Sequence, residues 1–234
     1  MKERLFRFKQ FSVSHARSAM PVGVDGVLVG AWATCAGERI LDAGTGCGMI
    51  ALMMAQRNAG ARILAVDTHL PSVEEASSNF SLSPWSDRLR VEARSFLDLT
   101  DEDGPFDVIV SNPPFFDAGA DNSVSARAMA RHVGDLSPRN LLIHGAPLLS
   151  RGGVISVIAP ASAEDILLEE SASVGLMPER RCLVRDHDGS PWKRILMEFG
   201  REGRDLREHL TMFGDGQVPT CRYRELCGQF YLKF

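Results

Sequence analysis

The chain has 234 residues, of which 44% are hydrophobic and 24% charged, and its formal net charge is −4. This composition is typical of one globular domain with a small extension, and the negative net charge excludes a protein that is basic over its whole surface. The five cysteines form no Cys-x-x-Cys pair. That argues against a disulfide framework and a zinc site, and it favours a reducing cytoplasm.

No apolar run in the sequence is long enough to cross a membrane, and residues 1–4 lack the apolar centre of a signal peptide. We therefore expect a cytoplasmic protein with no membrane partner and no metal, acting as a monomer.

The first twenty residues combine basic and aromatic side chains. The alternation of Phe6 and Phe8 predicts a short strand with one buried face. Arg4, Arg7 and Lys9 could bind a phosphate backbone while the phenylalanines stack on bases. Equally, the phenylalanines could be core residues of an added edge strand. We treat residues 1–24 as an extension and residues 25–234 as the main domain.

A loop over residues 20–24 precedes an apolar helix. Asp25 stands where it could cap that helix. Alternatively, the loop and Asp25 could close over a cofactor bound at the glycine-rich turn that follows.

Residues 39–43 predict a short buried strand, and residues 49–56 predict an apolar helix after it. Glycines in the turn between them allow a sharp bend and a close approach of a ligand to the backbone. The spacing is Gly-x-Gly-x-Gly, which differs from that of dinucleotide-binding folds and disfavours a nicotinamide oxidoreductase. The candidate cofactor residues of this motif are Asp42, Gly44, Thr45, Gly46 and Gly48.

A second acid, Asp67, follows the next predicted strand, residues 62–66, with Thr68 beside it. This is the position of a ribose-binding acid in a nucleotide-binding βαβ unit. With Asp42 available for an ammonium group, the pair fits S-adenosylmethionine. The alternative is an ordinary glycine-rich turn.

The remaining elements follow in order. A capping box at residues 72–75 predicts a helix to about Phe80, and residues 90–95 predict a strand after which Ser95 and Phe96 could contact the adenine of the cofactor. Further strands are expected at residues 106–111, 154–158, 181–185, 194–199 and 230–234, and helices at residues 138–149 and 164–173. The polar stretch 117–136 is long enough to be a substrate-binding lid.

The sequence Asn112-Pro113-Pro114-Phe115 ends the strand predicted at residues 106–111. Two prolines fix the backbone and remove two amide donors, so hydrogen-bond acceptors remain: the backbone carbonyls and the Asn112 side-chain oxygen. A planar exocyclic amine has two hydrogens and needs such acceptors, and Phe115 could stack on its ring. Held this way, the nitrogen can attack a methyl group without a strong base. The alternative is a rigid turn that ends a strand.

Alternating β and α units followed by terminal strands predict a doubly wound, mostly parallel seven-stranded sheet with an antiparallel edge and a small amino-terminal strand extension. The order of motifs resembles the class I S-adenosylmethionine-dependent methyltransferases, and more closely the bacterial tRNA1(Val) adenine-37 N6-methyltransferase family. The matching stretches are residues 6–11, 20–23, 25–28, 30–33, 41–46, 83–85, 111–116, 130–132, 193–194 and 230–234.

This resemblance implies methylation of the adenine beside the anticodon of tRNA1(Val), with Asn112, Pro113, Pro114 and Phe115 as catalytic residues and Asn112 also among the cofactor-binding residues. Basic residues beyond the motif, Arg127, Arg131 and His132, would help to bind the tRNA. Two alternatives stay open at this point. One is an N-methyltransferase that acts on ribosomal-RNA guanine or on a release-factor glutamine. The other is a non-catalytic RNA-binding module with a relic cofactor loop.

Overall fold

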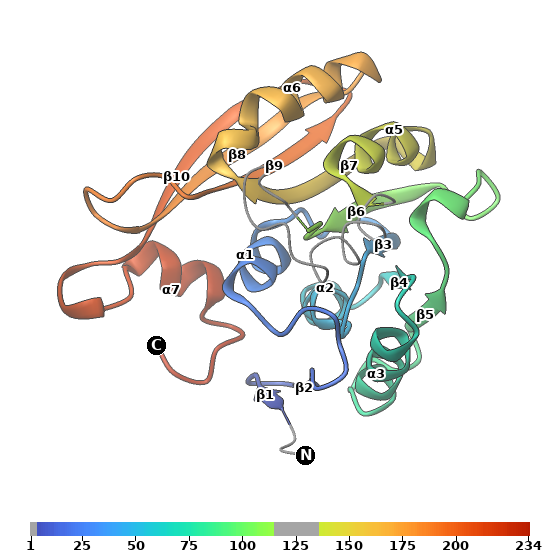
Figure 1. Ribbon diagram of the computed structural model, residues 1–234, viewed down its shortest axis with the longest axis horizontal. Coiled ribbons are helices and arrows are strands. Elements are labelled where there is room, and N and C mark those ends of the chain that lie inside the picture. Colours follow the sequence, from blue (N-terminus) through green and yellow to red (C-terminus); the bar gives the residue numbers. More distant parts are fainter. Residues whose placement is uncertain (1–3, 115–135) are drawn as a thin grey trace, which may run out of the picture.

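The computed structural model describes residues 4–114 and 136–234, and within these ranges eight strands form one mixed sheet (Figure 1). Across the sheet their order is β10-β8-β9-β7-β6-β3-β4-β5. The strands are β3 (Arg39–Ala43), β4 (Arg62–Asp67), β5 (Leu89–Ala93), β6 (Phe106–Ser111), β7 (Leu149–Pro160), β8 (Met177–His187), β9 (Arg194–Gly200) and β10 (Leu206–Phe213).

The sheet is parallel except at β9, which runs antiparallel to both β7 and β8. The expected doubly wound, mostly parallel sheet is therefore confirmed. Two details of the prediction are wrong: this sheet has eight described strands where seven were expected, and its antiparallel strand β9 lies between β7 and β8 where an antiparallel edge was expected. The edge is instead β10, which residues 206–213 form in parallel with β8 in a segment for which the sequence predicted no strand. Strands β3, β6 and β7 are buried on both faces, as their continuous apolar runs predict.

Helices cover both faces of the sheet and bury two separate apolar clusters (Figure 1). Helices α1, α2, α3 and α7 lie on one side, while α5 and α6 lie on the other. Their bounds are α1 (Val24–Trp32), α2 (Met49–Arg57), α3 (Leu70–Ser81), α5 (Pro138–Leu148), α6 (Glu164–Ser173) and α7 (Cys221–Cys227). The described connections include the short 3₁₀ turns η1 (Phe96–Asp98), η3 (Ala161–Ala163) and η4 (Asp215–Gln217).

The predicted amino-terminal strand is confirmed as the first strand of a two-stranded hairpin, β1 (Leu5–Arg7) and β2 (Ser12–Ser14). Phe8 and Phe11 are buried and stack on each other, with ring centroids 4.6 Å apart. Their burial favours the core interpretation over base stacking for these two rings. Both rings belong to the same apolar cluster as buried residues of α1 and α2. The division of the chain at residue 24 stays a prediction.

The carboxyl-terminal residues lie beside this hairpin. The strand predicted at residues 230–234 is wrong: Tyr231 makes a single bridge to Phe8, and the Lys9 amide donates to the Phe230 carbonyl over 2.8 Å. The pairing ends there, and residues 232–234 form no strand.

Two predicted helix starts are also wrong. Helix α1 is capped by the Gly23 position, and Asp25 lies inside its first turn. Helix α3 begins at Leu70, two residues before the predicted capping box, with Pro71 in its first turn. Proline favours that place because its missing amide would have no helical partner there. The predicted Ser137 cap of α5 is confirmed, since its hydroxyl accepts a hydrogen bond from the Asn140 amide.

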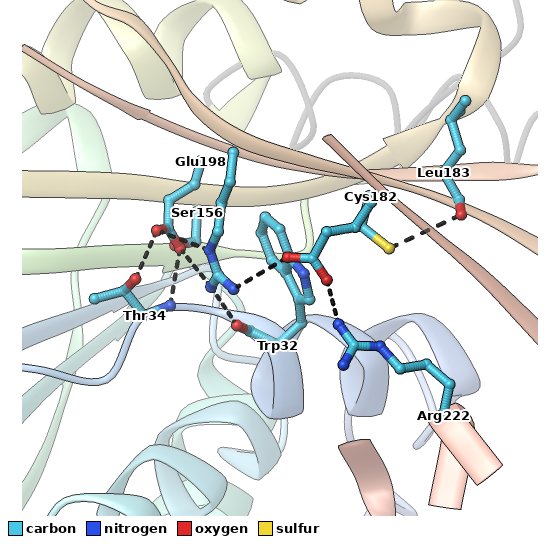
Figure 2. Close-up of polar contacts among 9 residues, drawn as sticks. Trp32, Thr34, Ser156, Cys182, Leu183, Glu198 and Arg222 are labelled. Carbon is cyan, nitrogen blue, oxygen red and sulfur yellow. Dashed lines mark hydrogen bonds and ion pairs between the residues drawn. The ribbon is translucent and has the colours of Figure 1, made fainter. Parts of the chain in front are cut away.

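A buried polar cluster joins the end of α1 to the middle of the sheet (Figure 2). Glu198 is 2% exposed and accepts hydrogen bonds from the Thr34 amide, the Thr34 hydroxyl and the Ser156 hydroxyl. Arg180 pairs with Glu198 over 3.2 Å and lies 4.0 Å from the Trp32 ring centroid.

Among the described residues, no helix has the length and apolar character needed to cross a membrane.

Candidate active site

The order of the strands reverses between β3 and β6. From β3 the chain continues outward to β4 and β5, whereas β6 lies on the other side of β3 and leads to β7. In open α/β sheets a ligand binds at this switch point, outside the carboxyl ends of the strands. The register pairs Ala43 with Ser111, so the glycine turn and Asn112 leave the sheet side by side.

The glycine turn has the backbone geometry that the sequence predicts. Gly44, Gly46 and Gly48 have φ values of +72°, +55° and +83°, which lie in the left-handed region that favours glycine. Neighbours also exclude a side chain: a Cβ on Gly44 would collide with Leu136, and one on Gly48 would lie 2.5 Å from the Phe80 ring. The turn therefore requires glycine at these positions.

Asp42 lies directly behind this turn and is completely buried. Its Oδ2 accepts hydrogen bonds from the Thr45 hydroxyl over 2.6 Å and from the Ala51 amide over 3.0 Å, while its Oδ1 has no partner. Burial raises the pKa of the Asp42 carboxyl to about 7, although both hydrogen bonds lower it. Asp42 thus ties the turn to the start of α2 and does not itself line the pocket described below.

Asp67 ends β4 on the opposite side of the glycine turn. Its Oδ2 accepts a hydrogen bond from the Gly46 amide and its Oδ1 accepts one from the His69 amide, both over 2.8 Å. The side chain is partly exposed, and a carboxylate has about four acceptor positions. Acceptor positions therefore remain for a ligand hydroxyl. Thr68, next in the chain, is exposed.

One pocket of about 400 Å³ includes both motifs. Thr45 and Gly46 form part of one wall, Asn112 lies at the end of β6, and Asp25 contributes from the first turn of α1. The residues that line it are Met20, Pro21, Val22, Gly23, Val24, Asp25, Gly26, Gly44, Thr45, Gly46, Cys47, Met49, Ile50, Asn112 and Arg194. The expectation that the loop at residues 20–24 lies beside the glycine turn is confirmed.

Arg194 is the pocket residue that the separate motifs did not indicate. It stands at the start of β9 and forms ion pairs with Asp25 and, over 3.1 Å, with Asp186. Its place in the pocket depends on the pairing of β9 with β7, which brings Arg194 beside Pro160 at the carboxyl edge of the sheet, and the residue pattern did not indicate that pairing. A signal was nonetheless present, because residues 193–194 belong to the stretches that carry the family resemblance.

Ser95 and Phe96 follow β5 and do not line the pocket. The Ser95 hydroxyl accepts a hydrogen bond from the Leu97 amide and caps η1, while Phe96 is 4% exposed and packs in the apolar cluster under α5. Their roles toward the cofactor adenine stay predictions.

The two prolines that follow Asn112 differ in exposure: Pro113 is buried and Pro114 is partly exposed.

The basic residues of the extension lie on the surface. Arg4, Arg7 and Lys9 are exposed, and the Lys9 ammonium donates a hydrogen bond to the Gly228 carbonyl over 2.6 Å. Several predicted site residues lie outside the described residues: Phe115, Arg127, Arg131, His132 and most of the predicted lid. Within residues 4–114 and 136–234, no group of three or more histidine, cysteine or acidic side chains is placed to hold a metal ion.

The fold and the pocket at its switch point define a doubly wound α/β protein with a ligand site at the carboxyl edge of its sheet. Comparison with solved structures agrees on the fold. A predicted O-methyltransferase from Agrobacterium tumefaciens superposes with a TM-score of 0.67, at 20% identity over 88% of this chain and 96% of that one. A putative RNA methyltransferase from Pyrococcus horikoshii gives a TM-score of 0.55, at 16% identity over 84% and 93% of the two chains.

Sequence comparison identifies the family. The model of the methyltransferase small domain matches residues 25–159. The tRNA1(Val) (adenine(37)-N6)-methyltransferase of Phocaeicola vulgatus is 42% identical over 99% of both chains, and that of Vibrio vulnificus strain YJ016 is 38% identical over all of this chain and 98% of the relative. The chain therefore belongs to the methyltransferase small domain family and, within it, to the tRNA1(Val) (adenine(37)-N6)-methyltransferases.

Proposed function

We propose that this chain transfers a methyl group from S-adenosylmethionine to N6 of adenine 37 in tRNA1(Val). The observation that carries the proposal is the pairing of Ala43 with Ser111, which brings the glycine turn and Asn112 to one pocket. Relatives that match over nearly the full length of the chain are named for this reaction, which supports the choice of substrate.

The size of the pocket and the hydrogen-bond acceptors around it fit a sulfonium nucleoside. The volume of about 400 Å³ is within the range of small-molecule sites. Asp67 keeps acceptor positions for the ribose hydroxyls, and the unpartnered Oδ1 of Asp42 is a hydrogen-bond acceptor behind the turn that would receive the methionine ammonium. When bound, S-adenosylmethionine supplies an electrophilic methyl group on its sulfur.

Asn112 and the two prolines hold the acceptor amine. The Asn112 side-chain oxygen and the Pro113 carbonyl accept the two hydrogens of the adenine amine, which directs the nitrogen lone pair toward the glycine turn. Pro113 and Pro114 have no amide hydrogen, so no backbone donor competes at this point. The rate then comes from positioning, with Phe115 expected to stack on the adenine ring.

The adenine must leave the stack of the anticodon loop to reach this pocket, as single-stranded RNA bases do in other complexes. Arg4, Arg7 and Lys9 would bind phosphates of the tRNA, together with Arg127, Arg131 and His132. The proposal places the enzyme in the cytoplasm, because its tRNA substrate is there. It also includes a monomeric state.

The substitution Asn112→Ala tests the assignment. It removes one acceptor for the amine and leaves the glycine turn intact, so methylation should fall by about 100-fold or more while cofactor binding changes little. Asn112→Asp keeps the acceptor and should retain more activity than Asn112→Ala. The measurement is methyl transfer from labelled S-adenosylmethionine to unmodified tRNA1(Val), followed by mass spectrometry of the nucleosides.

A tRNA with guanine at position 37 is the substrate control and should receive no label. Ribosomal RNA and a release factor, offered to the same enzyme, test the two other amine substrates. Near-normal methylation by Asn112→Ala, or label in a nucleoside other than N6-methyladenosine, would contradict the proposal. A chain that bound no cofactor would favour the non-catalytic alternative.

A further inference from the structure

Helix α3 carries three buried polar side chains along one face. Ser72, Glu75 and Asn79 are 0%, 4% and 3% exposed. Their spacing of three and four residues puts them in one row on the helix. Buried polar groups require hydrogen-bond partners, and the partners of this row come largely from residues 14–22, which we name the strap.

Glu75 collects most of these contacts. Its Oε1 accepts hydrogen bonds from the Ser14 hydroxyl over 2.9 Å and from the Ala16 amide over 2.8 Å. Its Oε2 accepts one from the Ser18 amide over 2.8 Å, and the Arg17 amide lies 3.1 and 3.2 Å from the two oxygens. One carboxylate therefore binds three successive amides of the strap. Hydrogen bonds to an ionised acceptor are the stronger kind.

The other two polar side chains of the row, Asn79 and Ser72, also bind the strap, and Asn79 reaches the glycine turn as well. The Asn79 amide nitrogen donates to the Ser14 carbonyl over 2.9 Å and to the Cys47 carbonyl over 2.8 Å, and its oxygen accepts from the Ser14 amide. The Ser72 hydroxyl accepts a hydrogen bond from the Ala19 amide over 3.2 Å. Asn79 thus binds the strap and the glycine turn at the same time.

The strap then continues into the pocket. The Ser18 hydroxyl lies 3.2 Å from the position that a Cβ on Gly46 would take, and Met20, Pro21 and Val22 line the pocket itself. His15 closes the strap on itself, since its Nδ1 accepts a hydrogen bond from the Val22 amide over 3.3 Å. The wall of the pocket that faces the glycine turn is therefore held from α3.

We propose that Glu75 is a positioning residue for the methyl donor: its carboxylate holds the strap across the glycine turn and so preforms one wall of the cofactor pocket. The inference rests on the proposed function, because it takes the pocket as the donor site. Glu75 does not line the pocket and acts through the strap. A preformed wall spares the ligand the entropy of ordering it, which appears as affinity.

The test compares Glu75→Gln with Glu74→Gln. The two residues are neighbours on α3 and the chemical change is the same, but the Glu74 side chain is 60% exposed. Within the described residues it pairs with the exposed side chain of the strap residue Arg17, so Glu74→Gln leaves the amide contacts of the strap in place. In Glu75→Gln an amide nitrogen would meet backbone amides, and two donors cannot bond to each other. Two readouts apply to the full chain: calorimetric titration with S-adenosylhomocysteine, and the rate of tryptic cleavage after Arg17.

We expect Glu75→Gln to weaken S-adenosylhomocysteine binding by at least tenfold and to speed cleavage after Arg17 by a similar factor. Saturating ligand should slow that cleavage again. Glu74→Gln should stay within about twofold of the wild type in binding. If Glu75→Gln does not fold, as judged by circular dichroism, Ser14→Ala removes one of the same hydrogen bonds and should weaken binding by about fivefold.

The outcomes separate this proposal from the proposed function. If the wild type binds S-adenosylhomocysteine and Glu75→Gln binds it equally well while its strap is cleaved faster, Glu75 has a structural role alone and the proposal is wrong. If the wild type binds none, the proposed function fails and this inference fails with it. Equal losses in Glu74→Gln and Glu75→Gln would also overturn it.

Discussion

Asp42 is a buried acid whose ionisation opposes folding. Because its pKa is raised to about 7 by burial, the folded state binds a proton over a pH range in which the unfolded state has already released one. Below pH 4 both states hold the proton and the residue costs nothing. As the pH rises from about 4 to 7 the free energy of unfolding falls, and above 7 the full loss, on the order of 4 kcal/mol, remains.

Replacement of Asp42 by asparagine should remove this dependence. The side-chain oxygen of the new asparagine can still accept from Thr45 and Ala51, and no charge is buried. We expect the stability of Asp42→Asn relative to the wild type to increase between pH 5 and pH 8, measured by urea unfolding without cofactor. A difference that is the same at both pH values would mean that Asp42 is ionised in the folded chain throughout. The stabilised variant should bind S-adenosylmethionine less well.

The glycine turn and the Asn-Pro-Pro motif of the site could each be predicted from the residue pattern. Gly44, Gly46 and Gly48 have the positive φ values that their motif requires, and Asn112 ends a strand beside them. Asp25 was different: its place before an apolar run is typical of a cap, but its carboxylate pairs with Arg194 from β9. A partner 169 residues away leaves no mark on the local sequence.

Helix α2 begins at Met49, and its N-cap Gly48 lies against Phe80 of α3. Gly48 combines a left-handed φ of +83° with a position 2.5 Å from Phe80 for any added Cβ. Gly175, at the end of α6, has a similar φ of +72° but nothing within 4 Å of its Cβ position. The two glycines therefore separate the cost of backbone strain from the cost of a collision.

We expect Gly48→Ala to lower the free energy of unfolding by about 2–4 kcal/mol and Gly175→Ala by about 1 kcal/mol. Thermal or urea unfolding of both variants gives the comparison, and Gly152→Ala, with open space and no positive φ, should be nearly neutral. Equal losses at positions 48 and 175 would show that Phe80 moves aside at little cost.

The start of α3 shows why elements were predicted better than their ends. Ser72 and Glu75 have the spacing of a capping box, and local pattern favoured a helix that begins there. In the structure both residues lie within the helix and bind the strap, and Pro71 was the local signal for the earlier start. A side chain that serves a distant segment can have the same spacing as one that serves its own helix.

The polar cluster around Glu198 connects three strands and the end of α1, so it bears on the stability of the complete chain (Figure 2). Glu198→Ala would leave Arg180 without its buried partner and two hydroxyls without an acceptor. We expect a loss of about 3–5 kcal/mol in the free energy of unfolding, with cofactor affinity unchanged because none of these residues lines the pocket.

The control for this variant is Glu208→Ala. Glu208 pairs with the exposed Arg222 and lies 4.0 Å from Arg180, so its loss should cost about 1 kcal/mol or less. Denaturant unfolding measures both variants, and calorimetry with S-adenosylhomocysteine checks the affinity. A drop in affinity that accompanied the loss at Glu198 would instead couple this cluster to the site.

The residue pattern determined the βα rhythm, the glycine turn and the Asn-Pro-Pro motif, because each depends on hydrophobic periodicity or on the backbone chemistry of a few consecutive residues. It also indicated the parallel sheet, and hence that both motifs meet at one edge. These features need no knowledge of which distant segments touch.

Tertiary packing alone decided the rest. The contact of Glu75 with residues 14–18, the pairing of Asp25 with Arg194 and the addition of β10 beside β8 all join segments far apart in the chain. Such contacts follow from which faces are left to be buried once the sheet has formed. Glu75 therefore has the spacing of a capping-box residue in the sequence, whereas in the folded chain its carboxylate binds three amides of a distant segment.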